Sequence, residues 1–270
     1  MNFVFQTLFI ETDFQNQLRV SLDDCERNQP DGYCNCIRHY SLESLDKPLV
    51  VEKLKKDNPD EWCPVGTIEF CEKWFTDVCG LPYCKPRNLP ECLFKYRGGM
   101  DSPSNKFQEL MSTKDRDYIN IVKDVKCFVK SNEIIKHPRN GVFSVKELIS
   151  EFSPWNGHDI QVSVLEDDIV SEWRAFIFHG KIIDIRPYVG DPFAAPSKLS
   201  VMEFVDEIQK SDDRIPSYTL DVFVTKNGRT KPLEMHDFFS CGLYGFQSHL
   251  YPAMLTQWFF YYKNKCRNLT

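Results

Sequence analysis

The first part of the chain alternates between strand-like and helix-like hydrophobic patterns, which predicts an α/β unit over residues 1–115. The run NFVFQTLFI near the N-terminus is almost wholly apolar and predicts a buried strand. From Pro64 onward, apolar residues recur at helical spacing as far as Val78, and Gly80 follows as a stop signal. The proline-punctuated segment LPYCKPRNLPECL predicts a loop or a short turn.

From about residue 119 the pattern becomes rich in β-strand signals. INIVKDVKCFVK predicts a strand, HPRNG a turn, and GVFSVKELISEF a strand followed by a short helix. The segments WRAFIF and KIIDIRPYV flank His179-Gly180 and predict a hairpin. The stretch YRGGMDSPSNKF has the composition of a linker, so we expect one domain over residues 1–118 and a second over residues 119–270.

Two further helices are expected in the second half. SKLSVMEFVDEIQKS predicts a helix that Ser200 caps, with one apolar face formed by Val201, Phe204, Val205 and Ile208. The C-terminal segment SHLYPAMLTQWFFYYKNKCRN predicts an aromatic helix that packs on the core and ends in a basic tail.

A second hairpin signal brings acidic side chains together. TLDVFVT and RTKPLEMH flank an Asn227-Gly228 pair, which favours a two-residue type I′ turn. With that turn Asp221 lies opposite Glu234, and His236 shares their face because side chains alternate along a strand. A three-residue loop would shift this register, and Pro232 indicates an edge or a bulge in the second strand.

Two facing carboxylates repel each other, so the pair admits three explanations. A hard cation such as Mg²⁺ can be bound by both acids. One carboxyl can have a raised pKa and act as a general acid. Alternatively, the face is solvated and both side chains project into water.

Cations follow the same β-rich region. Lys130 ends a strand-like run, Lys136 lies six residues later before a turn, and Arg174 lies inside an otherwise apolar strand with Glu172 on its face. Such cations are usually solvated, but fixed together they are the donors that a polyphosphate requires. Acids for Mg²⁺ and cations for phosphate together indicate a nucleotide site. No P-loop or Rossmann glycine pattern is present in the sequence.

Composition narrows the classes of function. The chain has 270 residues, 42% hydrophobic and 27% charged, which is ordinary for a globular protein. A net charge of −6 disfavours a dedicated nucleic-acid binder. Eleven cysteines occur without a Cys-x-x-Cys pair, and neither a signal peptide nor a membrane span is recognisable, so we expect reduced thiols and a cytoplasmic location. Cys241 is interpreted as a small loop residue and His137-Pro138 as a turn.

The order of these motifs resembles the ATP-grasp superfamily. FVK with the later lysine, QVSVLEDDIVSEWRAFIFHGKIIDIRPYVGD, YTLDVFVT and LEMHDFFSCGLYGF follow one another in the family's order over roughly residues 120–250. The clade that the chain resembles most is marked by one arginine and two lysines and is found in phages and bacteria. PVGTIEF and PRNLPECL also look like the region that precedes the core in that clade. A phage-encoded protein would act in the host cytoplasm.

The resemblance implies an α+β (α/β) architecture of two subdomains that clasp ATP, preceded by a smaller N-terminal α/β domain. The N-terminal lobe would span residues 119–160 and the C-terminal lobe residues 161–270. ATP and Mg²⁺ would be the cofactors.

Site residues also follow from the resemblance. Lys130 and Lys136 would be the paired lysines, one on the phosphates and one near the base. The hinge that meets adenine would be Ser163, Val164 and Leu165, with Glu166 or Glu172 near the ribose. Arg174 would hold the terminal phosphates in the transition state. Asp221 and Glu234 would bind metal, and Gly242–Gly245 would close the site.

One departure from the family pattern concerns the metal ligands. The family usually has Asn two residues after the metal-binding Glu, whereas this chain has His236. Imidazole is a softer Mg²⁺ ligand than an amide oxygen. His236 can therefore bind metal, contact substrate, or mark weakened metal binding.

The activity implied is an ATP-dependent ligase that converts a carboxylate to an acyl phosphate for attack by an amine. The partners would be small-molecule or peptide carboxylates and amines. An ATP-dependent RNA ligase is the alternative within the same fold, and Lys263, Lys265 and Arg267 could supply part of an RNA-binding patch. A degenerate nucleotide-binding protein without catalysis and a purely structural protein are the alternatives from other classes.

Overall fold

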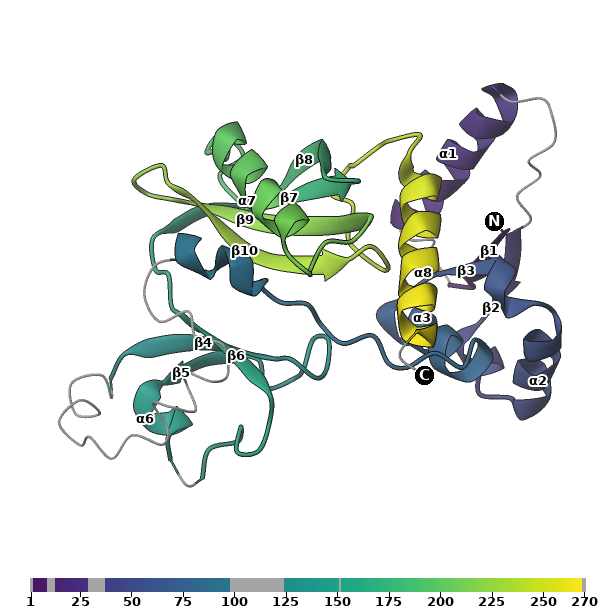
Figure 1. Cartoon of the computed structure of the whole chain (residues 1–270), viewed down its shortest axis with the longest axis horizontal. Coiled ribbons are helices and arrows are strands. Elements are labelled where there is room, and N and C mark those ends of the chain that lie inside the picture. The colour runs from purple at the N-terminus through teal and green to yellow at the C-terminus, as the bar shows by residue number, and fades with distance from the viewer. Residues whose placement is uncertain (1, 9–12, 29–36, 98–123, 151, 269–270) are drawn as a thin grey trace.

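The structure is a computed structural model that describes residues 2–8, 13–28, 37–97, 124–150 and 152–268. Most of the linker-like segment lies outside these residues, as do the end of the predicted N-terminal strand and the start of the strand expected from residue 119. The described chain forms three sheets, of which two share one hydrophobic core. Figure 1 shows the three sheets as separate layers, with the C-terminal helix between two of them.

The N-terminal part is a three-stranded parallel sheet of order β2-β1-β3, formed by Ile37–Tyr40, Asn2–Gln6 and Trp62–Val65. Phe3, Val4 and Phe5 are almost completely buried, as expected for the central strand of a parallel sheet. This confirms the strand predicted at the N-terminus. The surrounding helices are α1 (Asp13–Asn28), α2 (Pro48–Lys56) and α3 (Ile68–Lys73).

The helix predicted from Pro64 starts later than expected. Pro64 lies in the buried strand β3, where its missing N–H group is compatible with an edge of the sheet. Thr67 caps α3 by accepting a hydrogen bond from the backbone N–H of Phe70. The helix then widens into a π-helical turn, η3 (Trp74–Val78), and ends at Gly80, whose φ is +65°.

A small antiparallel sheet of order β5-β4-β6 forms a separate lobe. Its strands are Gly141–Ser144, Lys126–Ser131 and Ile160–Val164. The short helix α6 (Val145–Leu148) begins with a capping box between Ser144 and Glu147, which confirms the predicted strand followed by a helix. The lobe has its own core, which includes Val129, Leu148 and Trp155.

The largest sheet is antiparallel, with order β10-β9-β7-β8. Its strands are β7 (Ile169–Phe178), β8 (Lys181–Gly190), β9 (Ser217–Thr225) and β10 (Thr230–Asp237). The predicted hairpin between β7 and β8 is confirmed, and the φ angles of His179 and Gly180, +47° and +72°, suit a type I′ turn.

Helix α7 (Lys198–Lys210) buries the predicted face of Val201, Phe204, Val205 and Ile208. Its cap, however, is Ser197, whose side chain accepts a hydrogen bond from the backbone N–H of Ser200. The prediction of Ser200 as the cap was therefore wrong by about one helical turn. The remaining short elements are the 3₁₀ helices η1 (Leu42–Ser44), η2 (Pro59–Glu61) and η4 (Glu91–Tyr96).

The C-terminal aromatic helix is confirmed as α8 (Tyr251–Arg267), and its apolar side chains join the N-terminal sheet to the largest sheet. Trp258 and Phe259 pack against Phe75 of the N-terminal part, and Trp258 also stacks on Phe239, which follows β10. The lobe of β4–β6 lies beside β10 and outside this core (Figure 1). The candidate site lies where these parts meet.

Two general expectations concern thiols and membranes. The eight cysteines whose side chains are described are all free, and six of them are buried. Within the described ranges no helix combines the length and apolar character needed to span a bilayer.

Candidate functional site

The hairpin of β9 and β10 places Asp221 opposite Glu234, as predicted, but by a different route. The loop contains three residues, because Thr225 pairs with Arg229 through backbone hydrogen bonds. That loop shifts the register by one residue, and a bulge between Pro232 and Glu234 shifts it back. The predicted two-residue turn was therefore wrong, while the pairing of the two acids is confirmed.

Asp221 lies in the middle of β9, whose nine residues are all buried. Arg174 faces it from β7 and donates two hydrogen bonds, from Nε to Oδ1 and from Nη2 to Oδ2, each 2.8 Å long. The Tyr188 hydroxyl lies 3.3 Å from Oδ2. Burial opposes ionisation of Asp221, but the hydrogen bonds from Arg174 and the nearby His236 outweigh it and hold the pKa of Asp221 below its usual value.

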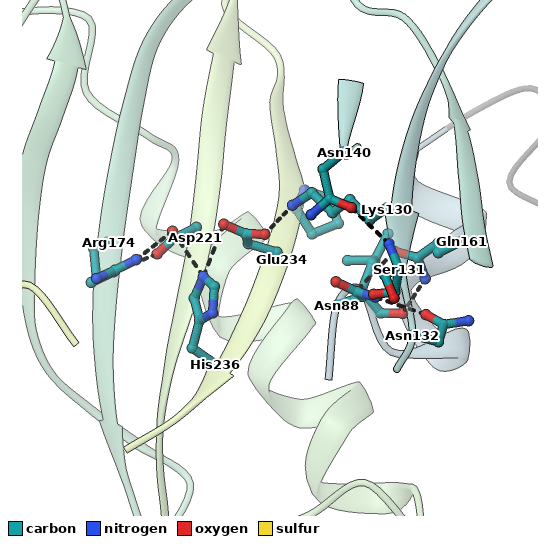
Figure 2. A network of polar contacts seen from close by, with 12 residues as sticks. Asn88, Lys130, Ser131, Asn132, Asn140, Gln161, Arg174, Asp221, Glu234 and His236 are labelled. Atoms are coloured by element: carbon teal, nitrogen blue, oxygen red, sulfur yellow. Dashed lines mark hydrogen bonds and ion pairs between the residues drawn. The ribbon is translucent and has the colours of Figure 1, made fainter. Parts of the chain in front are cut away.

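Glu234 projects from β10 toward the lobe and forms an ion pair with Lys130 of β4 (Figure 2). Its other carboxylate oxygen lies 2.9 Å from Nε2 of His236. Burial would raise the pKa of Glu234, but the positive charges of His236 and Lys130 outweigh that effect and hold the pKa well below its usual value. Glu234 is therefore an ionised carboxylate that joins the lobe to the largest sheet.

His236 completes the acidic cluster. Its Nε2 lies 3.6 Å from Asp221 Oδ2 as well as close to Glu234, although the side chain remains 35% exposed. Burial would lower the pKa of His236, but the charges of Glu234 and Asp221 raise it to about 9. The imidazole is thus protonated at neutral pH and occupies the position between two carboxylates where a cation is favoured.

The cluster of Asp221, Glu234 and His236 fits a divalent cation. One ligand atom from each residue lies within 4.8 Å of the others. Nε2 of His236 is buried and makes no hydrogen bond of good geometry, despite its short distance to Glu234. A buried nitrogen without a hydrogen bond is costly unless it gains another partner. Two carboxylates suit Mg²⁺, and the imidazole is the softer member of the set.

One cavity, of about 300 Å³, opens beside this cluster, and we call it the acid-site cavity. It is bounded by the N-terminal part, the lobe and the largest sheet. Lys130, Lys136, Arg174, Glu234 and His236 all line it, together with Gly242 and Tyr244 of the loop after β10. Arg174 also donates a hydrogen bond of 3.1 Å to the carbonyl oxygen of Gly242. The predicted cations and acids are therefore brought to one place.

A second cavity, of about 290 Å³, lies on the other side of Lys130, and we call it the hinge cavity. Its lining includes Ser163, Leu165, Glu166 and Glu172, all of which were predicted around the nucleotide. Phe128 and Leu233 add apolar surface. Strand β6 ends at Val164, between two of these residues.

Two predicted residues lie differently from the expectation. Lys136 has a φ of +51°, is exposed, and lines the acid-site cavity, not the hinge cavity. Glu166 already forms an ion pair of 2.7 Å with Lys231 of β10. Sequence reasoning missed Lys231, although its position three residues before Glu234 places it on the same strand.

Sequence reasoning also missed a segment that we call the strap, Arg87–Leu89. Arg87 donates a hydrogen bond of 2.8 Å to Asp237 at the end of β10. The side chain of Gln161 on β6 makes two hydrogen bonds with the backbone of Leu89. The strap thus crosses from the N-terminal part into the gap between the lobe and β10. The only signal in the sequence was its proline-bounded pattern, PRNLP.

The basic tail is committed to structure. Lys263 donates to the backbone carbonyl of Asp60 at 3.1 Å, and Arg267 makes two hydrogen bonds to the Asp60 carboxylate. Cys241 lines the acid-site cavity, but burial raises the pKa of its thiol to about 11 despite the opposing charge of Arg174. It remains a protonated loop residue at neutral pH.

Comparison with known protein families gives one match, over residues 111–254, to a family of the ATP-grasp domain that is described as family 2 of its clade. No sequence among curated proteins matches the chain significantly.

Several solved structures resemble the chain at low identity. D-cycloserine synthetase DcsG has 11% identity, covering 98% of this chain and 100% of its own, with a TM-score of 0.46. D-alanine–D-alanine ligase from Bacillus anthracis has 13% identity, covering 98% and 99%, with a TM-score of 0.46. ATP-grasp ligase PsnB, solved with precursor peptide PsnA2 and AMPPNP, has 10% identity, covering 97% and 96%, with a TM-score of 0.43. Likeness at this level does not extend to substrate.

The family match spans the lobe, the largest sheet and the first residues of α8, which are the elements that carry the acids and the cations. It confirms the ATP-grasp fold and the mixed α and β architecture that the resemblance implied. Because the match covers more than half of the chain, this protein belongs to the ATP-grasp superfamily.

Proposed function

We propose that this protein is an ATP- and Mg²⁺-dependent ligase that joins a carboxylate to an amine. The observation that carries the proposal is the cluster of Arg174, Asp221, Glu234 and His236 with Lys130, placed between two cavities in an ATP-grasp chain. One cavity has the apolar lining and backbone edge that suit a base, and the other has the cations that suit phosphates.

The nucleotide base would lie in the hinge cavity. Phe128, Leu165 and Leu233 supply apolar contacts, and the backbone of the segment after β6 supplies hydrogen-bonding groups. Glu166 and Glu172 are the acids near which the ribose would lie. Because Lys130 lines both cavities, a nucleotide seated here would direct its phosphates past Lys130 into the acid-site cavity.

The phosphates would meet Lys130, Lys136 and Arg174, which we propose as the two lysines and the arginine that mark the clade. Arg174 is preorganised, because its two hydrogen bonds to Asp221 and one to Gly242 fix the guanidinium before any ligand arrives. We propose Asp221 and Glu234 as Mg²⁺ ligands with His236 beside them. Bound there, Mg²⁺ would neutralise charge that develops on the phosphate oxygens.

In the first step an oxygen of the substrate carboxylate attacks the γ-phosphorus of ATP. The bond between that phosphorus and the bridging oxygen breaks, and ADP leaves as the acyl phosphate forms. An amine then attacks the acyl carbon, the carbon–oxygen bond to phosphate breaks, and the amine loses a proton to give the amide. Lys130 and Arg174 would stabilise charge on the transferred group, so no protein nucleophile is required.

Small-molecule or peptide carboxylates and amines are the proposed substrates, since the acid-site cavity, at about 300 Å³, has the volume of a small-molecule site. RNA ligation is less well supported. Two of the three basic residues that could have formed an RNA patch, Lys263 and Arg267, contact Asp60 instead.

The deciding experiment supplies the protein with MgATP labelled at the α-phosphate, with and without the small-molecule fraction of a cell extract. Labelled ADP that forms only with that fraction supports acyl-phosphate chemistry. Labelled AMP, or an AMP adduct on Lys130, would overturn the proposal in favour of RNA ligation. Binding of labelled ATP without turnover in any fraction would indicate a non-catalytic nucleotide-binding protein.

Two variants test the site assignment in the same assay. Glu234→Gln removes a charge from the acidic cluster without changing its shape, and Arg174→Ala removes the proposed transition-state contact. We expect ADP formation to fall by about 10²–10³-fold in each, while circular dichroism shows a retained fold. Glu203→Gln on the outer surface of α7 is the matched control and should keep full activity. Normal turnover in Glu234→Gln or Arg174→Ala would refute the assignment.

A further inference from the structure

Asn88 in the strap touches both strands that build the site. Its side-chain amide donates hydrogen bonds to the carbonyl oxygen of Ser131, at 2.9 Å, and to the side chain of Asn132, at 2.7 Å. Its own carbonyl oxygen accepts a hydrogen bond of 2.7 Å from the backbone N–H of Met235. One residue therefore bridges β4 of the lobe and β10 of the largest sheet.

The two anchoring points are next to the charged groups. Ser131 directly follows Lys130, and Met235 lies between Glu234 and His236. Figure 2 shows Asn88 beside Ser131, on the lobe side of the Lys130–Glu234 pair. The bridge through Asn88 thus runs alongside the ion pair and fixes the same two strands through backbone groups.

The surroundings of Asn88 are rigid. Only 7% of the residue is exposed, and its φ of +49° is a left-handed conformation that Asn tolerates better than most residues. Asn140 holds the N–H of Ser131 from the other side, at 2.9 Å. Arg87 and Leu89 are themselves tied to Asp237 and Gln161. Asn88 therefore has little freedom to move relative to either strand.

We propose that Asn88 is a positioning residue that sets the distance between Lys130 and the acidic cluster, and so aligns the phosphates for transfer. The inference rests on the proposed phosphoryl transfer at this site. Misplacement of a charged group by about 1 Å costs on the order of 10²-fold in rate. Asn88 touches the strands that carry the reacting groups and would act through them.

Three substitutions isolate the role of the side-chain amide. Asn88→Gly keeps the left-handed backbone and removes the amide. Asn88→Asp keeps the shape but replaces two N–H donors with oxygen atoms that face the oxygens of Ser131 and Asn132. Asn58→Gly is the matched control, because Asn58 has nearly the same φ, +48°, and its amide bonds to Glu61 in an exposed turn.

Kinetics give the first readout. With MgATP and the small-molecule fraction that supports turnover, we expect kcat for ADP formation to fall by about 10–100-fold in Asn88→Gly and further in Asn88→Asp. The KM for MgATP should stay within about threefold, because the hinge cavity is unchanged. A purely structural role would lower the amount of active protein without this split, and equal changes in kcat and KM would overturn the inference.

A second readout does not depend on any activity. Labelling of Lys130 by an amine-reactive ester, followed by mass spectrometry without nucleotide, reports how firmly Lys130 is held against Glu234. We expect the labelling rate of Lys130 to rise at least fivefold in both Asn88 variants and to stay unchanged in Asn58→Gly, with exposed Lys146 as the internal standard. An unchanged rate would overturn the inference. Absence of ATP turnover in the unaltered protein, with the labelling result as expected, would instead refute the proposed function alone.

Discussion

Asp221 is ionised although it lies in a fully buried strand, and its neighbours explain how. A buried carboxylate is strongly destabilising unless it is paired and hydrogen-bonded. The two hydrogen bonds from Arg174 meet that requirement, and the Tyr188 hydroxyl adds a third contact. Removing either partner of such a pair leaves an uncompensated buried charge. The pair therefore fixes the site at the same time as it limits which substitutions the sheet tolerates.

The first prediction concerns the unusual metal-site residue, His236. Because its pKa is about 9, a divalent cation must displace a proton or approach a positive charge at pH 7. Asparagine offers a neutral, hard oxygen instead. We expect His236→Asn to bind Mg²⁺ about tenfold more tightly at pH 7 by titration calorimetry, with exposed His249→Asn unchanged. Weaker binding in His236→Asn would show that the imidazole is a preferred ligand.

His236 also predicts how stability depends on pH without divalent cations. Its pKa is higher in the folded chain, about 9, than its ordinary value of 6.5. Its contribution to stability is thus complete below about pH 6.5 and is lost as the pH rises through about 9. The side chain is about a third exposed, so screening reduces the effect to about 1–2 kcal/mol.

Urea unfolding at pH 6.5 and pH 9.5 tests this dependence. The free energy of unfolding of the wild-type chain should fall by about 1–2 kcal/mol more than that of His236→Asn between the two values. An equal fall in both proteins would mean that the imidazole does not gain its proton affinity from Glu234 and Asp221.

At the scale of elements, two hairpin glycines in the largest sheet have left-handed backbones but different surroundings. A Cβ atom at Gly190 would lie 2.2 Å from the carbonyl oxygen of Val170, whereas one at Gly228 would meet no atom within 4 Å. We expect Gly228→Ala to cost about 1 kcal/mol, from the positive φ alone, and Gly190→Ala to cost more than about 2 kcal/mol. Urea unfolding of both variants measures this, and equal costs would contradict it.

The same hairpins show which parts of the fold could be predicted from the sequence. Alternation and turn residues gave the β7–β8 hairpin and the face shared by Asp221, Glu234 and His236. The extra loop residue and the bulge compensate for each other, and neither has a distinct local signal at Asn227-Gly228 or Pro232. Ser197 rather than Ser200 caps α7 because the cap is selected by where the chain turns, which two nearby serines cannot distinguish.

Contacts between parts distant in the sequence were not predictable in this way. The strap reaches Met235 and Gln161 across more than 70 residues, and no periodic pattern encodes such a pairing. The position of α8 between the two larger sheets likewise depends on the assembled core. The residues of the site could be named from motifs, whereas the division between two cavities required the assembled molecule.

At the scale of the whole molecule, the two cavities should separate nucleotide binding from metal binding. ADP at about 100 times its Kd should stabilise the folded chain by about 2.7 kcal/mol, which raises Tm by roughly 5–10 °C. Leu165→Arg would fill the hinge cavity and abolish most of that rise, while Mg²⁺ binding at Asp221 and Glu234 persists. Leu199→Arg makes the same change at a residue that is 78% exposed on α7 and should leave the rise intact.

Thermal unfolding with ADP, together with Mg²⁺ calorimetry, measures both responses in the three proteins. A rise in Tm that survives in Leu165→Arg would place the base outside the hinge cavity, and loss of Mg²⁺ binding in that variant would mean that the two cavities are not separable. Lys130 lines both cavities, so the expected separation also implies that the lobe keeps its position beside β10 when the hinge cavity is filled. That position is the one the strap holds through Asn88, and the two experiments therefore test one arrangement from opposite sides of Lys130.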